Sequence, residues 1–530
     1  MKLLNSFFKR KKNKNSSITT EEELFSKEEL PKAYFISLSE NKKQLQQLFQ
    51  QSFDFKMDDI KIGNHFACVC YLETMLDKNE LTNKVLNAAQ GSIEDKVLLN
   101  IESIRNTYFP TVAYEYDENF HKVIWHVLNG HAVILIDGIQ QALSLEIGRT
   151  ENRSITEPST QTIIRGPKDG FVEDLNTNIS LIRRRIKNPH IKFEKLQVGR
   201  DSKTTVAIGF IDNITNQDIL DEVRIRVKKI DASAILDSGN IEEFITDKSI
   251  TPFPLLFNTE RPDSISAHLL EGKVAIIVDG SPFVLSVPSL LIDFFQATED
   301  YYQPFLMASF IRMIRYVSFM VALLLPSLYV AVSTFHHELL PTQLLISIQA
   351  QREGVPFPAV IEIILMELTF EVLREAGIRM PRAVGQTVSI VGALVIGQAA
   401  VEAGLVSNVL VIVVAFTAIA SFVSPIYNFS ITTRLLRFIL ILMSSILGLY
   451  GVLTFLILMV IHLVSLRSFG VPYLAPVAPF FPSDHDDVFV RLPIWANKSR
   501  PSYLYSKAPV KKSGNYTPSP PTSKSGDNTT

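Results

Sequence analysis

Cysteine is scarce in this 530-residue chain, which contains only Cys68 and Cys70. Both lie in a predicted strand from His65 to Leu72 and are two residues apart, so their side chains point to one face. A single pair of this kind can build neither a zinc site nor a disulfide framework. Buried, reduced thiols are therefore the favoured interpretation.

An excess of charge is also missing. The chain has 52 Lys and Arg against 54 Asp and Glu, a formal net charge of -2. A surface that neutralises a nucleic-acid backbone needs a basic excess, so nothing indicates a nucleic-acid partner. The local basic run at residues 9–12 is interpreted as part of a solvated tail or as a contact with anionic lipid.

Catalytic signatures are absent as well. The chain has no Gly-rich phosphate loop followed by Lys and Ser or Thr, no His-Glu-x-x-His, no Gly-x-Ser-x-Gly and no cluster of Cys and His ligands. His121, His126 and His131 occur at mixed spacings and are interpreted as structural or surface residues. The sequence thus predicts a protein that is not an enzyme and has no cofactor or metal.

The first 304 residues contain no long hydrophobic run, and no secretory signal follows the basic run. We therefore expect a soluble, cytoplasmic N-terminal part, with a disordered tail over residues 1–30. Beyond Pro31, helical and strand patterns alternate, which predicts a two-lobed α/β domain. The lobes are expected at residues 31–150 and 151–304.

Two segments repeat each other at one constant offset: HVLNGHAVILIDG from His126 to Gly138, and HLLEGKVAIIVDG from His268 to Gly280. Each predicts the end of a helix, a buried strand and an Asp-Gly hairpin turn, because glycine tolerates positive φ. The alternatives are a chance similarity and two related lobes. Related lobes would leave a cleft between them where a ligand could bind.

Between the repeats, Phe171 to Lys187 is predicted as a helix that ends in three arginines, Arg183, Arg184 and Arg185. These arginines are candidates for contact with anionic lipid head groups. The alternative is a solvated last turn that complements the helix dipole.

The second half is rich in uncharged runs, and an all-α, multi-pass membrane domain is predicted over residues 305–467. Spans are expected near residues 316–335, 384–406, 408–427 and 438–464. The last of these contains Gly448 and Gly451, so one long helix and a tight pair both remain open. Arg312 and Arg315 on the flank of the first span agree with a cytoplasmic N-terminal domain.

An acidic helix at residues 358–376 holds the candidate ion path or gate. A helical wheel places Glu367, Glu371 and Glu375 on one face and Glu362 off it. Ionisable groups at membrane depth are costly, so the stripe indicates a cation path in an oligomer. The alternative is an interfacial helix that lies flat. If this helix crosses the membrane, the arginines at 434 and 437 lie on the cytoplasmic side, where the positive-inside rule favours basic residues.

Small residues follow in the next span, and Gly392, Gly397 and Gly404 are candidate positions for close helix packing. The aromatic, proline-rich segment 468–496 is expected at the membrane interface. A disordered tail is expected over residues 497–530, where Ser, Pro, Lys and Thr dominate.

With these residues in view, the chain resembles the A subunits of the GerA-type spore germinant receptors. The resemblance rests on several blocks together: NISLIRRRIK at 178–187, TERPDSI at 259–265, EDYYQPF at 299–305, LMELTFEVLREAGIRMP at 365–381, SIVGALVIGQAAVEAGLVS at 389–407 and SFGVPYLAPVAPF at 468–480. It covers about Phe171 to Trp495, and the first 120 residues carry little of it.

The resemblance implies a multi-pass subunit in the spore inner membrane that acts with a B subunit and a C subunit. Such receptors sense small nutrients and start germination, with early release of monovalent cations. It also implies a homo-oligomer of the A subunit that forms an ion-conducting part, and a germinant bound mainly by the B subunit. A secondary transporter and a scaffold that only assembles other subunits are the alternative functions.

Overall fold

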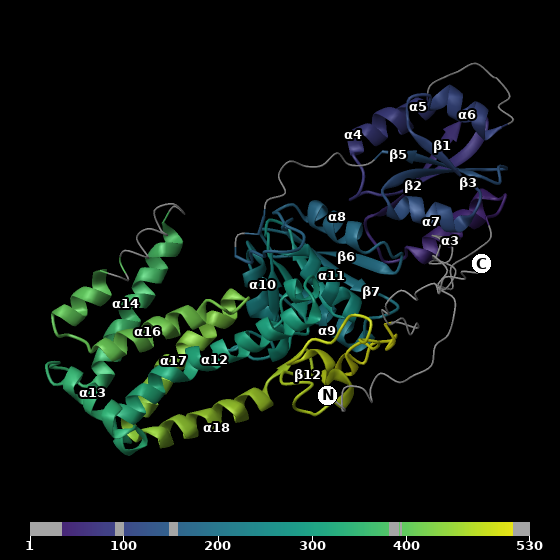
Figure 1. The fold of residues 1–530 in the computed structure, drawn as a ribbon. Coiled ribbons are helices and arrows are strands. Elements are labelled where there is room, and N and C mark those ends of the chain that lie inside the picture. Colours follow the sequence, from purple (N-terminus) through teal and green to yellow (C-terminus); the bar gives the residue numbers. More distant parts are fainter. Residues whose placement is uncertain are drawn as a thin grey trace, which may run out of the picture. The chain divides into compact units, whose positions relative to one another are not determined.

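A computed structural model describes residues 34–90, 100–147, 157–158, 160–380, 392 and 395–511. The chain divides into two compact units, Met1–Asn152 with Lys187–Pro189, and Arg153–Ile186 with His190–Thr530. In the described residues, each unit has a five-stranded sheet, and the second unit also has a helical bundle (Figure 1). Residues 384–391, 393 and 394 of the predicted span near 384–406 lie outside the described residues.

The sheet of the first unit has the order β1-β2-β4-β5-β3, and all neighbouring strands are antiparallel. Its strands are β1 (Phe55–Ile62), β2 (His65–Leu72), β3 (Tyr114–Asp117), β4 (His131–Ile136) and β5 (Ala142–Glu146). The helical segments are α3 (Leu38–Leu48), α4 (Lys78–Leu81), η1 (Thr82–Leu86), α5 (Asn87–Gln90), α6 (Ile101–Tyr108) and α7 (Phe120–Leu128).

Helices cover both faces of this sheet (Figure 1). One core joins α3 and α7 to the strand face that carries Cys68 and Cys70, and the other joins α6 to the face that carries Val69 and Ile134. Because side chains alternate between faces, a strand buried on both sides is apolar at nearly every position, as His131–Ile136 is. Both cysteines are free and 0% exposed, which confirms the predicted buried thiols.

The second unit repeats this topology, with the order β6-β7-β9-β10-β8. Its strands are β6 (Ile191–Val198), β7 (Thr204–Ile211), β8 (Phe257–Thr259), β9 (Val274–Val278) and β10 (Val284–Val287). Its helices are α8 (Leu175–Arg185), α9 (Gln217–Lys228), α10 (Ser238–Ile245) and α11 (Pro262–Glu271). We call the two sheet regions the first and second lobes.

Individual contacts repeat along with the strand order. In the first lobe, Leu38 N donates to Asp137 Oδ1 at 3.0 Å, and in the second, Leu175 N donates to Asp279 Oδ1 at 3.2 Å. Both aspartates precede a glycine with positive φ, Gly138 at 82° and Gly280 at 88°. The turn therefore fixes each hairpin and also holds the first turn of a helix. Shared contacts of this kind favour two related lobes over a chance similarity.

The aligned hairpins differ in one buried polar cluster. In the first lobe, His126 Nδ1 lies 2.8 Å from Asp117 Oδ1, and the Ser144 hydroxyl also donates to Asp117. In the second lobe, the offset that aligns His126 with His268 puts Thr259 in place of Asp117. His268 Nδ1 there lies 3.0 Å from Ser286 Oγ. Only the first of these clusters therefore has a buried carboxylate beside its histidine.

This difference predicts a pH dependence for the first lobe. Burial lowers the pKa of His126, but the hydrogen bond to Asp117 and its charge outweigh burial and raise it. Because the pKa of His126 is higher in the folded protein than in the unfolded chain, protonation of His126 stabilises the folded lobe. This stabilisation is complete below the pKa of the unfolded chain, about 6.5. This contribution is lost as pH rises through the folded pKa. Burial and the charge of His126 lower the pKa of His131, so its contribution changes only below about 6.5.

His126→Gln should therefore remove the fall in stability above about pH 6.5. Chemical unfolding followed by the fluorescence of Trp125, in a Trp495→Phe background, measures this. The matched control is His337→Gln, in the other unit, which should keep the wild-type slope. A His126→Gln protein with an unchanged slope would contradict the assignment.

The helical bundle follows the second lobe. It consists of α12 (Phe305–Thr334), η4 (His337–Leu339), α13 (Thr342–Arg352), α14 (Ala359–Arg379), α16 (Asn408–Ser421), α17 (Tyr427–Leu447) and α18 (Leu449–Ser465). Among the described residues, α12 and α17 are long and apolar enough to cross a membrane, and α16 and α18 are shorter apolar helices.

The helices in the region of two predicted spans have other bounds than the spans. Of the two alternatives left open for 438–464, the structure has the pair of helices, which break at Gly448, and α17 begins earlier, so that it contains the arginines at 434 and 437. Gly448 has a φ of 60°, and a Cβ there would lie 2.8 Å from His336 Cε1, so glycine suits this sharp turn. The span predicted at 408–427 ends at Ser421 in α16.

The remainder is the C-terminal segment, residues 466–511, with β11 (Arg467–Ser468), β12 (Val471–Pro472), η5 (Pro482–Asp487) and η6 (Ser502–Leu504). Tyr473, expected at a membrane interface, is 0% exposed and packs on Phe253 and Phe294 of the second lobe. The disordered tail predicted from residue 497 is wrong for 497–511, because Arg500 Nε donates to Leu270 O at 2.8 Å and Leu504 is buried.

Candidate functional site

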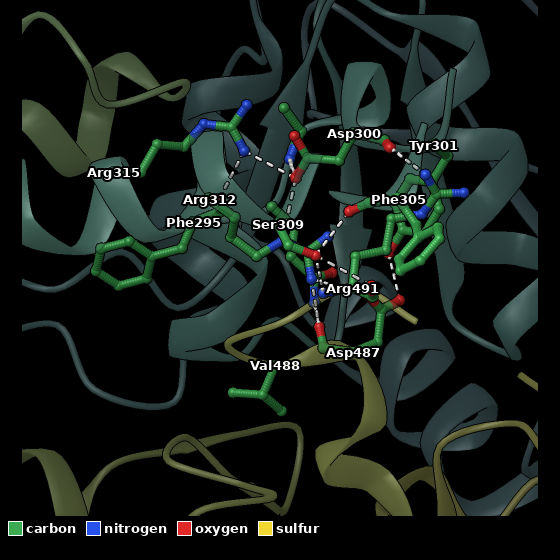
Figure 2. A network of polar contacts seen from close by, with 12 residues as sticks. Phe295, Asp300, Tyr301, Phe305, Ser309, Arg312, Arg315, Asp487, Val488 and Arg491 are labelled. Carbon is green, nitrogen blue, oxygen red and sulfur yellow. Dashed lines mark hydrogen bonds and ion pairs between the residues drawn. The ribbon is translucent and has the colours of Figure 1, made fainter. Parts of the chain in front are cut away.

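A buried network of ion pairs joins the second lobe, the first turns of α12 and the C-terminal segment. We call it the junction, and it comprises Asp300, Tyr301, Arg312, Arg315, Asp487 and Arg491 (Figure 2). Asp300 and Tyr301 belong to the short helix η3 (Thr298–Tyr301), which directly precedes α12 and follows η2 (Leu291–Phe294). The C-terminal segment, which is far away in the sequence, therefore meets the end of the second lobe and the start of α12 at one place.

Arg312 is the centre of the junction and is 0% exposed. Its Nε lies 3.1 Å from Asp300 Oδ2, and its NH1 group lies 2.7 Å from Asp487 Oδ1 and 2.6 Å from the carbonyl oxygen of Asp487. A planar guanidinium is suited to this role because its fork reaches two partners at once. Arg312 thus ties the first turns of α12 to the lobe and to the C-terminal segment.

Two further arginines complete the junction (Figure 2). Arg315 NH1 donates to Asp300 Oδ2 at 2.8 Å, and Arg491 NH1 donates to the carbonyl oxygen of Asp300 at 2.7 Å. The Tyr301 hydroxyl donates to Asp487 Oδ2 at 2.6 Å. Burial raises the pKa of Asp487, and Arg312 and Tyr301 oppose this shift.

The junction holds three buried guanidinium groups: Arg312 and Arg315 pair with the carboxylates of Asp300 and Asp487, and Arg491 binds backbone carbonyl oxygens. Removing charges from water costs several kcal/mol per ion, and this cost is recovered only if every partner is in place. A displacement of the lobe or of the C-terminal segment therefore pulls directly on α12. The arrangement can transmit movement between these parts, and it contains no nucleophile or acid–base pair placed for catalysis.

The sequence did not point to this network. Arg312 and Arg315 entered the sequence analysis only as basic residues on the flank of a predicted membrane span, and the structure buries both in ion pairs. Asp487 lies 175 residues from Arg312 along the chain, so no local pattern links them. The available signal was the block 299–305, EDYYQPF, which contains Asp300 and Tyr301.

The four glutamates of the acidic helix lie in α14, but they do not form an open acidic stripe. Glu367 Oε2 lies 2.7 Å from Arg437 NH1 of α17, and both side chains are 2% exposed. Glu371 Oε2 lies 2.6 Å from Arg434 NH1, also in α17. Both arginines that the positive-inside count used are therefore helix residues paired with acids.

The other two glutamates differ from this pair. Glu362 is 0% exposed, accepts a hydrogen bond from Ser407 N at 3.1 Å and lies 3.5 Å from Arg352 NH2. Glu375 is exposed and paired with Arg379. The structure thus brings Glu362, Glu367 and Glu371 into the bundle and leaves Glu375 at its surface.

The candidate packing glycines lie close to other parts of the same chain. A Cβ on Gly392 would lie 3.0 Å from Leu373 Cδ2 of α14, and one on Gly397 would lie 3.7 Å from Val411 Cγ1 of α16. Gly404 has a φ of 67°, and its Cβ position lies 3.4 Å from the carbonyl oxygen of Gly354. Small residues at these positions permit close helix approach within the bundle.

The arginine run at the end of α8 does not offer three free guanidinium groups to lipid. Arg183 is 1% exposed, with its guanidinium carbon 5.1 Å from the centre of the Phe193 ring. Arg185 is bound to Asp169 at 2.5 Å, and Arg184 is exposed. The prediction of a three-arginine lipid contact is therefore wrong, because two of the three side chains are engaged within the lobe.

Together, the duplicated lobes, the junction and the helical bundle with two candidate membrane spans define a class: a two-lobed α/β domain coupled to a bundle of apolar helices. The family model described as "Bacillus/Clostridium GerA spore germination protein" matches residues 43–503. The chain belongs to this family.

Curated relatives agree over nearly the whole chain. It is 45% identical to spore germination protein KA of Bacillus subtilis (strain 168) over 495 residues, which cover 92% of this chain and 90% of the relative. It is 40% identical to spore germination protein GerLA of Bacillus cereus over 456 residues, which cover 86% and 93%. It is also 42% identical to the membrane protein YfkQ of Bacillus subtilis (strain 168), over 89% of this chain and 92% of the relative.

One solved structure is also similar, the N-terminal domain of the A subunit of the Bacillus megaterium spore germinant receptor GerK3. The identity is 31%, the match covers 49% of this chain and 97% of the solved one, and the TM-score is 0.39.

Proposed function

We propose that this protein is a membrane subunit of a nutrient-germinant receptor, which couples the sensing of a small molecule to the start of spore germination. In this proposal it acts in the spore inner membrane as a homo-oligomer, with B and C subunits, and the B subunit binds most of the germinant. The junction carries the proposal, because it links the α/β lobes to the bundle through buried ion pairs. Membership of a family of spore germination proteins supports it.

The helix directions support a bundle that starts and ends on the side of the second lobe. The first turns of α12 contact the lobe through the junction, and its other end lies beside Gly448. α17 also begins beside the lobe, where Thr432 Oγ1 donates to the carbonyl oxygen of Pro252 at 2.5 Å, and it ends at Gly448. α18 then returns, because His462 Nε2 lies 2.9 Å from Thr251 Oγ1.

α14 and α16 run parallel to each other, toward the lobe. Near their starts, Glu362 binds Ser407 N, and near their ends, Arg374 NH2 donates to Ser421 Oγ at 2.9 Å. α17 begins next to the end of α16, where Ser430 Oγ donates to the carbonyl oxygen of Ser421. Because α14 ends at Arg379 on the lobe side and α16 begins at Asn408 on the opposite side, we infer an even number of passages. The lobes and the C-terminal segment are then both cytoplasmic.

Cysteine labelling tests this topology. In sealed vesicles of one orientation, an impermeant maleimide should react with Lys228→Cys in the second lobe and with Lys507→Cys in the C-terminal segment. It should react with Glu338→Cys only in vesicles of the opposite orientation. The two native cysteines are buried and give little background. Labelling of Lys507→Cys together with Glu338→Cys would contradict the proposed topology.

The side chains of α14 favour a helix that crosses the membrane over one that lies flat. Its charged residues Glu362 and Glu367 are buried in the bundle, whereas Leu365, Leu368 and Val372 are exposed to 44%, 52% and 68%. A helix at a water interface would present its charges to water. An apolar outer face with charges inside is the pattern expected in lipid.

We further propose that Glu362, Glu367, Glu371 and Glu375 line or flank a cation path. In this structure the three bundle glutamates are compensated by arginines of the same chain, as expected of a closed state. Opening then requires that these pairs separate, so that carboxylates become available to cations. The junction would deliver the movement that separates them.

Flux measurements test the path. Purified protein in liposomes should conduct monovalent cations, and Glu371→Gln should change the flux. Unchanged flux in all four glutamate-to-glutamine variants would rule out the assignment.

A secondary transporter would instead accumulate radiolabelled nutrient. A scaffold would allow normal germination of spores with the four variants, whereas deletion of the whole chain would abolish it.

A further inference from the structure

One loop of the second lobe, residues 247–252, reaches the helical bundle. It follows α10 and has no regular secondary structure. Thr251 Oγ1 lies 2.9 Å from His462 Nε2, in the last turn of α18. The carbonyl oxygen of Pro252 accepts a hydrogen bond at 2.5 Å from Thr432 Oγ1 of α17. The loop therefore contacts both α17 and α18 near the ends that face the lobe.

The loop belongs to a connection that is much shorter in the first lobe. By their order along the chain, α10 and β8 correspond to α6 and β3. Residues 109–113 join α6 to β3, whereas residues 246–256 join α10 to β8. Phe253 in the longer connection is 3% exposed, and its ring packs near those of His462 and Tyr473. The second lobe thus has additional residues where it meets the bundle.

The contact with α17 gives the depth of the loop. α17 has 21 residues and is therefore about 31 Å long, close to the thickness of a hydrocarbon core, about 30 Å. Thr432 lies about 7 Å along the helix from its first residue, Tyr427. If α17 crosses the membrane, the carbonyl oxygen of Pro252 lies below the start of the helix. The loop then reaches the boundary between lipid head groups and acyl chains.

The loop also runs along the end of α18. Asp247 Oδ2 accepts a hydrogen bond from Phe469 N, beyond the helix, whereas Thr251 meets His462 within it. Ile250 directly precedes Thr251 and is 86% exposed. Ile250 therefore lies near the level of the last turn of α18, and its side chain is outside the protein core.

Outward-facing apolar side chains lie on α18 at and below this level. Ile457, Ile461 and Val464 are exposed to 53%, 60% and 56%. A single exposed isoleucine is ordinary on a surface that faces water. Ile250, however, lies at the end of an apolar helix surface that faces lipid when α18 crosses the membrane. Lipid that covers the last turn of α18 would cover Ile250 as well.

Two basic side chains flank the loop. Lys248 and Arg467 are exposed, and among the described residues no carboxylate pairs with either. Arg467 lies two residues beyond the end of α18, and Lys248 lies two residues before Ile250. The neighbouring carboxylate of Asp247 is compensated, because Arg226 NH2 lies 2.6 Å from its Oδ1. An apolar side chain beside free basic groups is typical of a segment that lies in an anionic membrane surface.

We propose that this loop is a membrane contact of the second lobe, in which Ile250 enters the bilayer interface and Lys248 and Arg467 bind phosphate groups of anionic lipids. The proposal rests on the proposed membrane role of the bundle. The contact is separate from the junction, because no residue of the loop belongs to the junction. Anionic lipid would thus hold the second lobe to the membrane by a second route.

Fluorescence quenching in nanodiscs of phosphatidylcholine and phosphatidylglycerol tests the contact. The full-length protein carries Trp125→Phe and Trp495→Phe, so that Ile250→Trp is its single tryptophan. Lipids brominated near the head group should quench its fluorescence by at least about half, because an interfacial side chain lies about 5–10 Å deep. Ser249→Trp is the second variant if Ile250→Trp does not fold. A folded variant without quenching would overturn the proposal, and a blue-shifted emission would then show that another protein chain covers the loop.

Two control positions separate this proposal from the membrane role of the bundle. Leu236→Trp should not be quenched, because Leu236 is 76% exposed and precedes α10, about 12 Å from the loop along that helix. Ile457→Trp in α18 should be quenched most by lipids brominated near the chain end. Quenching of Ile457→Trp without quenching of Ile250→Trp would refute the membrane contact alone. Quenching of neither would refute both proposals, and equal quenching of Leu236→Trp would refute a specific contact.

Lipid preference tests the basic residues. In the Ile250→Trp protein, quenching by brominated phosphatidylglycerol is compared with quenching by brominated phosphatidylcholine at equal mole fraction. The phosphatidylglycerol should be enriched at the loop, and Lys248→Gln and Arg467→Gln should each lower this enrichment by about fivefold, as expected for one basic residue at an anionic surface. Lys203→Gln, in the exposed turn between β6 and β7, is the matched control and should keep the enrichment. An enrichment that both loop variants leave unchanged would refute the role of Lys248 and Arg467.

Discussion

Arg312→Ala should destabilise the full-length protein by about 3–5 kcal/mol, the usual cost of removing one partner from a buried ion pair. The expected loss is large because Asp300 and Asp487 then lose their shared guanidinium partner. Asp300 would retain Arg315, but Asp487 would retain only the Tyr301 hydroxyl among the side-chain contacts shown in Figure 2. Unfolding in mixed micelles, followed by circular dichroism, measures the change.

The matched control is Arg379→Ala, which removes the exposed partner of Glu375. Surface ion pairs contribute about 0–1 kcal/mol, so this variant should unfold almost as the wild type does. Arg312→Lys should fall between the two, because it keeps the charge but loses the planar fork. If Arg312→Ala and Arg379→Ala unfold alike, the junction does not hold the bundle to the lobe.

A second large effect is expected at the pair Glu367–Arg437. Glu367→Gln leaves the Arg437 guanidinium buried without a counter-ion, and Arg437→Met leaves the Glu367 carboxylate in the same situation. Each single change should cost about 3–5 kcal/mol, whereas the double change should cost less than the sum, because it leaves no unpaired charge. The three variants and the wild type form a double-mutant cycle.

The coupling energy from that cycle should exceed about 1 kcal/mol in magnitude, since the two residues are in direct contact. Glu375→Gln with Arg379→Met, an exposed pair in α14, provides the comparison cycle and should give a coupling of about 0.3–0.5 kcal/mol. A Glu367–Arg437 coupling as small as that of the exposed pair would show that the bundle does not rest on this contact.

Local patterns in the sequence predicted much of the lobes. Each repeat ends in an Asp-Gly turn that allows only a few backbone geometries, so the hairpins at Asp137 and Asp279 followed from residue type and spacing. The strand predicted from His65 to Leu72 has the same bounds in β2. Short-range turn chemistry and alternating burial decide these elements, and both can be read along the chain.

The partners of the charged residues could not be predicted in this way. A helical wheel of α14 shows which acids share a face, but it says nothing of the arginines of α17 that meet them. The wheel therefore indicated an acidic stripe, whereas Glu367 and Glu371 are neutralised by Arg437 and Arg434. The C-terminal segment was mispredicted for the same reason, because its partners in the second lobe are far away in the sequence. Its polar composition predicted disorder, although Leu504 is buried against the second lobe.

The central claim is that a nutrient signal passes through the junction to the bundle, and Asp300→Asn tests it most directly. Asparagine keeps the shape and one acceptor oxygen but removes the charge between Arg312 and Arg315. Release of monovalent cations is measured after nutrient addition, in spores that contain equal amounts of variant and wild-type protein. We predict that release slows by at least about fivefold, in line with typical coupling energies between sites. Release at the wild-type rate would contradict the claim.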